Sequence, residues 1–253
     1  MPEVLVLGSG GALPSAKRDN TYLAVRGESS VLLIDCAGSP IQRLRQMGVD
    51  PTSLRALIVT HHHPDHIYGV PILILGMWLL GRQDDLEVYG PLKAVASVAS
   101  LLEVVDATDW PALFGTVFHA IPLIERTLVL ETEDFRVYSS PVAHMVACVA
   151  LRIEHKASGA VMVYSSDTEP CDALVRLGAG ADLLLHEATG NFQGHSSPRQ
   201  AGEMAQAMNA KRLVLVHLSN NGADGDEELW QREAREAYAG PVSIAHDLER
   251  FEF

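Results

Sequence analysis

The sequence predicts a layered α/β fold in which two sheets pack face to face and helices cover their outer faces. First, short runs rich in Val, Ile and Leu alternate with longer helical patterns along the chain, which is typical of α/β layering. Second, both halves of the chain contain such runs, so each half can supply one sheet. The chain has 253 residues, of which 47% are hydrophobic and 20% charged, and no linker interrupts it. We therefore expect a single domain over residues 1–253.

The expected elements follow one another in a definite order. Strands are expected in the first half at residues 4–7, 22–25, 31–34, 56–59 and 87–89. In the second half they are expected at residues 127–131, 136–138, 147–152, 161–164, 183–185, 213–216 and 242–245. Helices are expected at residues 40–47, 67–80, 92–105, 173–177, 198–208 and 227–237. The strand runs are short and β-type, whereas the helical segments between them are longer.

The glycines after the first expected strand, in VLVLGSGGALP, invite comparison with a dinucleotide-binding loop. The fingerprint GxGxxG requires a third glycine where Leu13 stands. The next residues, PSAKRDN, read as a polar loop, so no helix N-terminus is present to hold a pyrophosphate. Asp35 ends a strand as a ribose-binding carboxylate would, but that alone is weak support. The pattern indicates a glycine turn between two strands.

Charge, cysteine content and hydrophobic pattern argue against several classes of partner and of site. The formal net charge is −13, with 19 basic against 32 acidic residues, which argues against structured nucleic acid as a partner. The three cysteines, Cys36, Cys148 and Cys171, form no CxxC pair and suggest neither a disulfide framework nor a thiolate zinc site. The apolar run over residues 67–81 is shorter than the ~20 residues of a membrane span. Without a leader pattern at the N-terminus, we expect a cytoplasmic location and no membrane partner.

The segment RALIVTHHHPDH crowds titratable side chains directly after a strand. In an extended segment, residues two apart point the same way, so His61 and His63 can converge while His62 faces away. Asp65 and His66 then follow at the start of the next helix. Nitrogen and oxygen ligands without thiolate suit Zn²⁺, with Mn²⁺ and Fe as alternatives. The pattern predicts a metal site.

THHHPDHIYG resembles the THxHxDHxxG signature of the metallo-β-lactamase superfamily, and the similarity continues along nearly the whole chain. His144 after DFRVYSSPVA, Asp167 in VYSSDT and His217 in LVLVHLS stand where that family has further ligands. The resemblance implies an αββα sandwich of two mixed sheets flanked by helices. It also implies two divalent metal ions, one held by His61, His63 and His144, the other by Asp65, His66 and His217, with Asp167 bridging them.

The implied metal pair predicts a hydrolase. Two ions ~3.5–4 Å apart can bridge a water, lower its pKa and deliver hydroxide while polarising the scissile group. The chain contains no GxSxG motif, and no separate nucleophile is required. Asp65 is a further candidate catalytic residue, which would help to orient the water.

Three stretches, LEVYGP, ADLLLHEATG and GHSSPRQAGEMAQAM, resemble the ribonuclease Z branch of the superfamily. The resemblance implies that His195 contacts the scissile phosphate and protonates the leaving oxygen as a general acid. Either His186 or Glu187 could orient His195 by a hydrogen bond. The alternative for those two is a buried polar pair at a strand end.

The chain departs from the tRNA-processing members of that branch. His144 and Asp167 are 23 positions apart, an interval where those members carry a long Gly- and basic-rich arm. Here the interval reads as two strands joined by a tight HKASG turn, and the family's HEATF is HEATG, with Gly190 in place of an aromatic residue. Together with the acidic charge, this disfavours a tRNA 3′-processing endonuclease.

The leading hypothesis is therefore hydrolysis of a small phosphodiester, such as a cyclic nucleotide or an aryl ester of phosphate. The alternative is a carboxylic ester, lactone or sulfate ester on the same metal centre. A non-catalytic metabolite-binding protein is disfavoured, because all seven ligand positions are filled. Four aromatic residues could form core, a subunit interface or a lid: Trp78, Trp110, Phe114 and Phe118. The large apolar content also suggests a homodimer.

Overall fold

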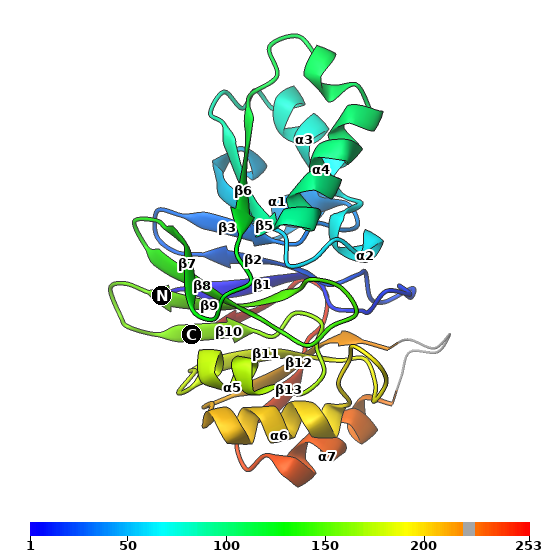
Figure 1. The fold of residues 1–253 in the computed structure, drawn as a ribbon, viewed down its shortest axis with the longest axis vertical. Helices are drawn as coiled ribbons and strands as arrows, with labels where there is room; N and C mark the ends of the chain where they lie inside the picture. Colours follow the sequence, from blue (N-terminus) through cyan, green and yellow to red (C-terminus); the bar gives the residue numbers. More distant parts are fainter. Residues whose placement is uncertain (220–225) are drawn as a thin grey trace.

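The computed structural model describes residues 1–219 and 226–253 and arranges them in four layers, helix, sheet, sheet and helix (Figure 1). The two sheets lie at the centre, and the helices cover their outer faces. The predicted αββα sandwich is confirmed.

Each sheet contains seven strands and mixes parallel with antiparallel pairs. The first sheet has the order β14 (Glu249–Glu252), β1 (Glu3–Gly8), β2 (Tyr22–Arg26), β3 (Val31–Ile34), β4 (Leu54–Ile58), β5 (Leu86–Pro91) and β6 (Thr116–Ile121). The second sheet has the order β13 (Val242–Ile244), β12 (Leu213–Leu218), β11 (Leu183–Ala188), β10 (Val161–Tyr164), β9 (Val149–His155), β8 (Phe135–Pro141) and β7 (Thr127–Glu131). Strands β3 to β6 run parallel in one sheet and β10 to β13 in the other, so their carboxyl ends come to common edges.

Seven α-helices are present in the described residues. The first sheet is covered by α1 (Pro40–Gln46), α3 (Val70–Leu79) and α4 (Leu92–Val104), and α2 (Pro64–Ile67) is a single turn beside the sheets. The second sheet is covered by α5 (Asp172–Gly178), α6 (Pro198–Met208) and α7 (Glu227–Ala237). Within residues 1–219 and 226–253, no helix has the length and apolar character needed to cross a bilayer.

Three apolar cores hold these layers together. The central core lies between the sheets and contains fully buried side chains from both, such as Val6 and Leu185. The two outer cores lie under the helices, around residues such as Leu73 of α3 and Ala201 of α6. The strand residues therefore alternate between the central and an outer core, as period-two patterns require.

Two strands were not predicted from the sequence, and one predicted helix is split in two. β6 and β14 are the two terminal strands of the first sheet, and most of their side chains are partly or fully exposed, so neither shows the continuous apolar run of a fully buried strand. The helix expected over residues 67–80 is broken at Gly69, where a Cβ would lie 2.8 Å from the carbonyl oxygen of Ala37. Pro71 reinforces the break, because it lacks the N–H that a continuous helix requires.

The interval between His144 and Asp167 forms the predicted pair of strands. β9 and β10 are antiparallel neighbours, and the turn between them is closed by hydrogen bonds from the His155 N–H to the Ala160 carbonyl (2.9 Å) and from the Gly159 N–H to the His155 carbonyl (2.8 Å). No extended arm leaves the sandwich at this point.

Candidate metal centre and proton donor

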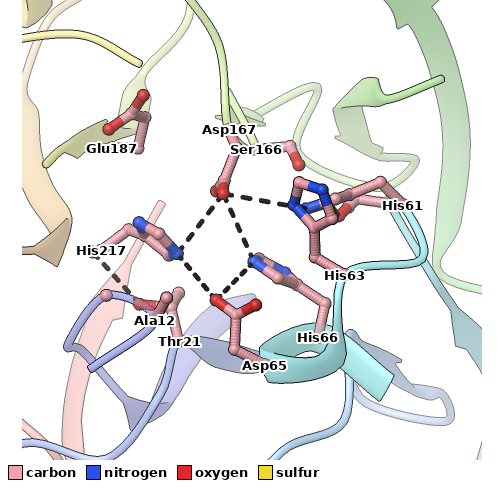
Figure 2. Close-up of polar contacts among 12 residues, drawn as sticks. Ala12, Thr21, His61, His63, Asp65, His66, Ser166, Asp167, Glu187 and His217 are labelled. Carbon is pink, nitrogen blue, oxygen red and sulfur yellow. Dashed lines mark hydrogen bonds and ion pairs between the residues drawn. The ribbon is translucent and has the colours of Figure 1, made fainter. Parts of the chain in front are cut away.

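The side chains predicted to bind metal lie together at the edge of the sandwich where strands from both sheets end (Figure 2). The first sheet supplies the segment after β4 and the turn α2, and the second supplies the ends of β8, β10 and β12. The residues brought together are His61, His63, Asp65, His66, His144, Asp167 and His217. His62 is not among them and has its Nδ1 buried without a hydrogen-bond partner.

Three histidines form the first half of the cluster. The Nδ1 atom of His63 lies 3.1 Å from the Nε2 atom of His61 and 3.1 Å from the Nε2 atom of His144. The Nε2 atoms of His61, in the segment after β4, and of His144, in the segment after β8, therefore both face the Nδ1 atom of His63. This arrangement suits lone pairs that converge on one cation.

Asp65, His66 and His217 form the second half, and Asp167 lies between the halves. The Asp65 Oδ2 atom is 3.4 Å from the Nε2 atoms of both His66 and His217. The Asp167 Oδ2 atom is 3.5 Å from each of the same two nitrogens and 3.8 Å from the Nε2 atom of His61. Figure 2 shows these contacts as dashed lines that meet at Asp167.

The residues fit a pair of divalent cations. The Nε2 atom of His66 and the Oδ1 atom of Asp167 are buried and have no hydrogen-bond partner in the described residues. A buried polar atom without a partner costs about 1–3 kcal/mol, so this structure is incomplete without a ligand at those atoms. The donor set consists of imidazole nitrogens and carboxylate oxygens, which divalent metals such as zinc accept. The cluster and the fold together indicate divalent metal binding.

Hydrogen bonds on the far side of the imidazole rings orient them. The Nδ1–H of His66 donates to Asp35 Oδ2 at 2.8 Å, and the Nδ1–H of His144 donates to the Gly194 carbonyl at 2.7 Å. In the same way, Thr60 accepts from His61 at 3.1 Å and Thr189 accepts from His217 at 2.7 Å. With the proton held on Nδ1, Nε2 presents a lone pair to the cluster.

The sequence does not predict these orienting groups. It suggests Asp35 only as a weak candidate for a ribose-binding carboxylate, whereas in the structure Asp35 accepts hydrogen bonds from the backbone N–H of Thr60 at 2.8 Å and from His66. Its one sequence signal is a carboxylate directly after the apolar strand VLLI. The glycine turn after β1 also contributes, because the Thr21 hydroxyl donates to the Gly10 carbonyl at 2.9 Å and accepts from the His217 N–H at 3.1 Å.

Burial and neighbouring charges set the ionisation of the cluster. Burial lowers the pKa of His61, His63 and His144, which favours their neutral, ligand-binding form. Burial opposes ionisation of Asp65, but the neighbouring imidazoles of His217 and His66 outweigh it and hold the pKa of Asp65 below its ordinary value. Burial likewise opposes ionisation of Asp167, but His217 and His66 lower its pKa; against the effect of burial, the Asp167 charge raises the pKa of both imidazoles, so a cation bound there would displace their protons.

Three residues at the site adopt left-handed backbone conformations. Asp35 has a φ of 58°, Ser166 of 53° and His217 of 51°. Such a conformation costs a non-glycine residue of order 1 kcal/mol or more and persists when neighbouring contacts hold it. Here it turns the chain sharply at strand ends, which aims side chains into the cluster.

Replacing Asp35 by asparagine should weaken metal binding about 10- to 100-fold without unfolding the protein. The asparagine keeps the size of the side chain but removes the charge that accepts the hydrogen bond from His66. The measurement is metal affinity by competition with a chromophoric chelator. Asp134→Asn is the matched control, because Asp134 is also buried but accepts hydrogen bonds from Ser29 and Ser30. Equal affinity in the two variants would contradict the role of Asp35.

A second constellation, Glu187 with His195, lies beside the metal ligands. The Nδ1–H of His195 donates to Glu187 Oε1 at 3.2 Å, and the His195 ring stacks on that of His217 with centroids 5.8 Å apart. Glu187 Oε1 also accepts from the backbone N–H of Ser196 at 2.8 Å, and Oε2 from that of Thr189 at 2.9 Å. The carboxylate is therefore fixed by the backbone and orients His195.

His186 does not share in this constellation. Its Nδ1 contacts the carbonyl oxygen of Glu187 at 2.7 Å, and its Nε2 is buried without a hydrogen-bond partner. Adjacent strand residues point to opposite faces, so Glu187 faces the site and His186 faces the helical layer. Of the two predicted orienting residues, Glu187 makes the contact.

The four aromatic residues considered for a lid pack into the outer core of the first sheet instead. The rings of Trp78 and Trp110 lie 5.5 Å apart, and the indole N–H of Trp78 donates to the Pro111 carbonyl at 3.1 Å. Phe114 is buried in the same core, and Phe118 packs against it. Their contacts are those of core packing.

Comparison with known proteins shows similarity over most of the chain. Residues 31–218 match the family model described as beta-lactamase superfamily domain. The ribonuclease Z of Methanothermobacter thermautotrophicus is 29% identical, with 98% of this chain and 95% of that protein covered. The structure of the short form of human tRNase Z superposes with a TM-score of 0.79 and 26% identity, covering 99% of this chain and 98% of that chain. The metallo-β-lactamase fold protein YhfI from Bacillus subtilis superposes with a TM-score of 0.82 and 24% identity, covering 100% of this chain and 99% of its own.

The archaeal ribonuclease Z also differs from this chain in length. The alignment runs over 304 residues although it contains 98% of a 253-residue chain. The relative therefore carries segments that have no counterpart here.

Proposed function

The chain belongs to the β-lactamase superfamily, and from this membership and the geometry of the site we propose that it is a dinuclear zinc phosphodiesterase that acts on small phosphodiesters. Its fold is that of the metallo-hydrolases of the superfamily, and it is an ester-bond hydrolase. What is proposed beyond this is that the scissile bond is a phosphodiester, that the substrate is small and that the metal ions are zinc.

The contact between Glu187 and His195 is the observation that supports a phosphodiester. Expulsion of an alkoxide from phosphorus is assisted by a group that delivers a proton to the leaving oxygen. His195 is buried beside the ligand His217, and its Nδ1 is engaged by Glu187. Its other ring nitrogen is therefore available to carry the transferable proton toward a substrate held at the cluster.

The roles of the remaining residues follow from their places. His61, His63 and His144 would hold one ion, Asp65, His66 and His217 the other, and Asp167 would contact both. When bound, the ions would supply a water of lowered pKa and polarise the phosphoryl oxygen. Asp65 Oδ2 lies between His66 and His217, where a carboxylate can also orient that water by a hydrogen bond.

The small size of the substrate is supported by the absence of an arm and by charge. The interval between His144 and Asp167 is occupied by a hairpin with a tight turn, and the chain carries a net charge of −13. A protein that grips the tRNA body needs many cationic contacts to phosphates. Cleavage of tRNA 3′ ends remains the second candidate, because relatives named ribonuclease Z cover the whole chain at 26% identity.

A panel of substrates would test this proposal on the zinc-loaded protein. We expect turnover of nitrophenyl phosphodiesters, no turnover of lactones or sulfate esters, and slow cleavage of a precursor tRNA. Chelation should abolish the activity and added zinc should restore it. Turnover of lactones alone would overturn the phosphodiester, and efficient processing of precursor tRNA would favour the second candidate.

A further inference from the structure

An exposed aromatic side chain, Phe192, lies against His195. The two rings have their centroids 4.9 Å apart at an interplanar angle of 52°, and Phe192 is 53% exposed. A single exposed apolar residue is ordinary on a protein surface. Phe192 differs because its ring contacts His195, the proposed proton donor, and because it belongs to a loop that hydrogen bonds close next to that residue.

The loop over residues 190–195 holds Phe192 in this position. The Gly190 N–H donates to the Ser196 carbonyl at 3.0 Å, and the His195 N–H donates to the Phe192 carbonyl at 3.0 Å. Gly190 has a φ of 149°, and a Cβ at this position would lie 2.7 Å from the Phe192 ring. Only glycine lets the ring approach the backbone so closely.

A second apolar side chain, Met145, is exposed next to the same loop. Met145 follows the ligand His144 and is 53% exposed, and its Cγ lies 3.1 Å from the place of a Cβ on Gly194. The carbonyl of Gly194 in turn accepts the hydrogen bond from His144. Phe192 thus contacts His195, Met145 lies beside the preceding residue Gly194, and both side chains are 53% exposed.

We propose that Phe192 is a specificity-determining residue that stacks on an aromatic ring carried by the leaving alcohol of the substrate. The inference rests on the proposed phosphodiesterase function and adds the class of substrate to it. The proton donor must lie next to the leaving oxygen, so side chains next to His195 face the leaving alcohol rather than the retained group. A planar aromatic group, either aryl or nucleobase, complements a fixed phenyl ring.

The reaction remains a balanced hydrolysis. An oxygen from water forms a bond to phosphorus, and the bond between phosphorus and the leaving oxygen breaks. His195 gives its proton to that oxygen, the alcohol departs with its ring, and the water's proton replaces the one that His195 lost. Phe192 binds the ring and exchanges no proton.

The test compares two phosphodiesters that differ in one ring, benzyl methyl phosphate and ethyl methyl phosphate, on the zinc-loaded protein. Wild type should release benzyl alcohol in preference to methanol. Phe192→Ala should lower kcat/KM for the benzyl ester about 10-fold and change that for the ethyl ester less than about twofold. Phe192→Leu should behave like Phe192→Ala because it lacks a flat face, and Phe192→Tyr should restore the benzyl rate. Leu128→Ala, at an exposed apolar position on β7, is the control and should change neither rate.

The outcomes separate the inference from the function on which it rests. Equal losses on both esters, or no loss on either, would overturn the role of Phe192 while turnover by wild type still supports a phosphodiesterase. If wild type hydrolysed nitrophenyl phosphodiesters but neither of these esters, the role of Phe192 would be overturned and the phosphodiesterase would stand; no turnover of any phosphodiester would overturn both. Thymidine 3′-(methyl phosphate) serves as a third substrate. Faster release of thymidine than of benzyl alcohol would indicate that the ring that stacks on Phe192 is a nucleobase. Slower release would indicate that it belongs to an aryl alcohol.

Discussion

Substitution of Asp167 by alanine should abolish turnover and remove at least one of the two proposed metal ions. Asp167 is buried, and its Oδ2 atom lies within 3.5–3.8 Å of the Nε2 atoms of His61, His66 and His217. A carboxylate at this position would neutralise charge on both cations, so its loss would affect both sites at once. The measurement is metal content per chain by mass spectrometry after dialysis, together with the rate on a nitrophenyl phosphodiester.

A second variant separates metal binding from folding. Asp167→Asn keeps an oxygen ligand without the charge and should retain the fold, as judged by circular dichroism, with weakened binding of metal. If Asp167→Ala kept both ions and a normal rate, the assignment of the bridging position would be wrong.

Substitution of His195 by alanine should leave the metal content unchanged and lower the rate about 10²- to 10⁴-fold on substrates with a poor leaving group. The loss should be much smaller for nitrophenolate, which departs without protonation. This dependence on the leaving group identifies a proton donor, because a structural defect would slow all substrates alike. His119→Ala is the control: His119 pairs with Glu87 and stacks on Tyr89 on β5, and its loss should not change the rate.

The orientation of His195 can be tested through its partner. Glu187→Gln should reproduce part of the His195→Ala loss with the same dependence on the leaving group, because the amide presents a weaker acceptor to Nδ1–H. An unchanged rate in both variants would return the pair to a purely structural role.

Much of the fold was predictable because local sequence patterns report burial directly. The runs that became β3, β7 and β10 were predicted with their observed bounds, since each combines β-type residues with clear turn signals on both sides. The strands that were not predicted are β6 and β14, which lie at the ends of the first sheet and have mostly partly or fully exposed side chains. The break at Gly69 was not predicted either, because there the N–H donates to the distant carbonyl of Cys36 at 2.9 Å.

For the site, the sequence predicted which side chains the structure gathers, because metal binding requires particular side chains and these follow strands in the order of the resembled family. His61, His63, Asp65 and His66 are close in sequence, and their convergence needs only one strand and one turn. The sequence did not indicate how each imidazole is oriented. The acceptors that orient the histidines lie about 30 to 50 residues away from them in the chain: Asp35, Thr189 and the Gly194 carbonyl. The sequence around an acceptor does not indicate which histidine donates to it. The three-dimensional packing of the two sheets chooses those partners, and it also places Phe192 over His195, because contacts between distant segments exist only once the layers have assembled.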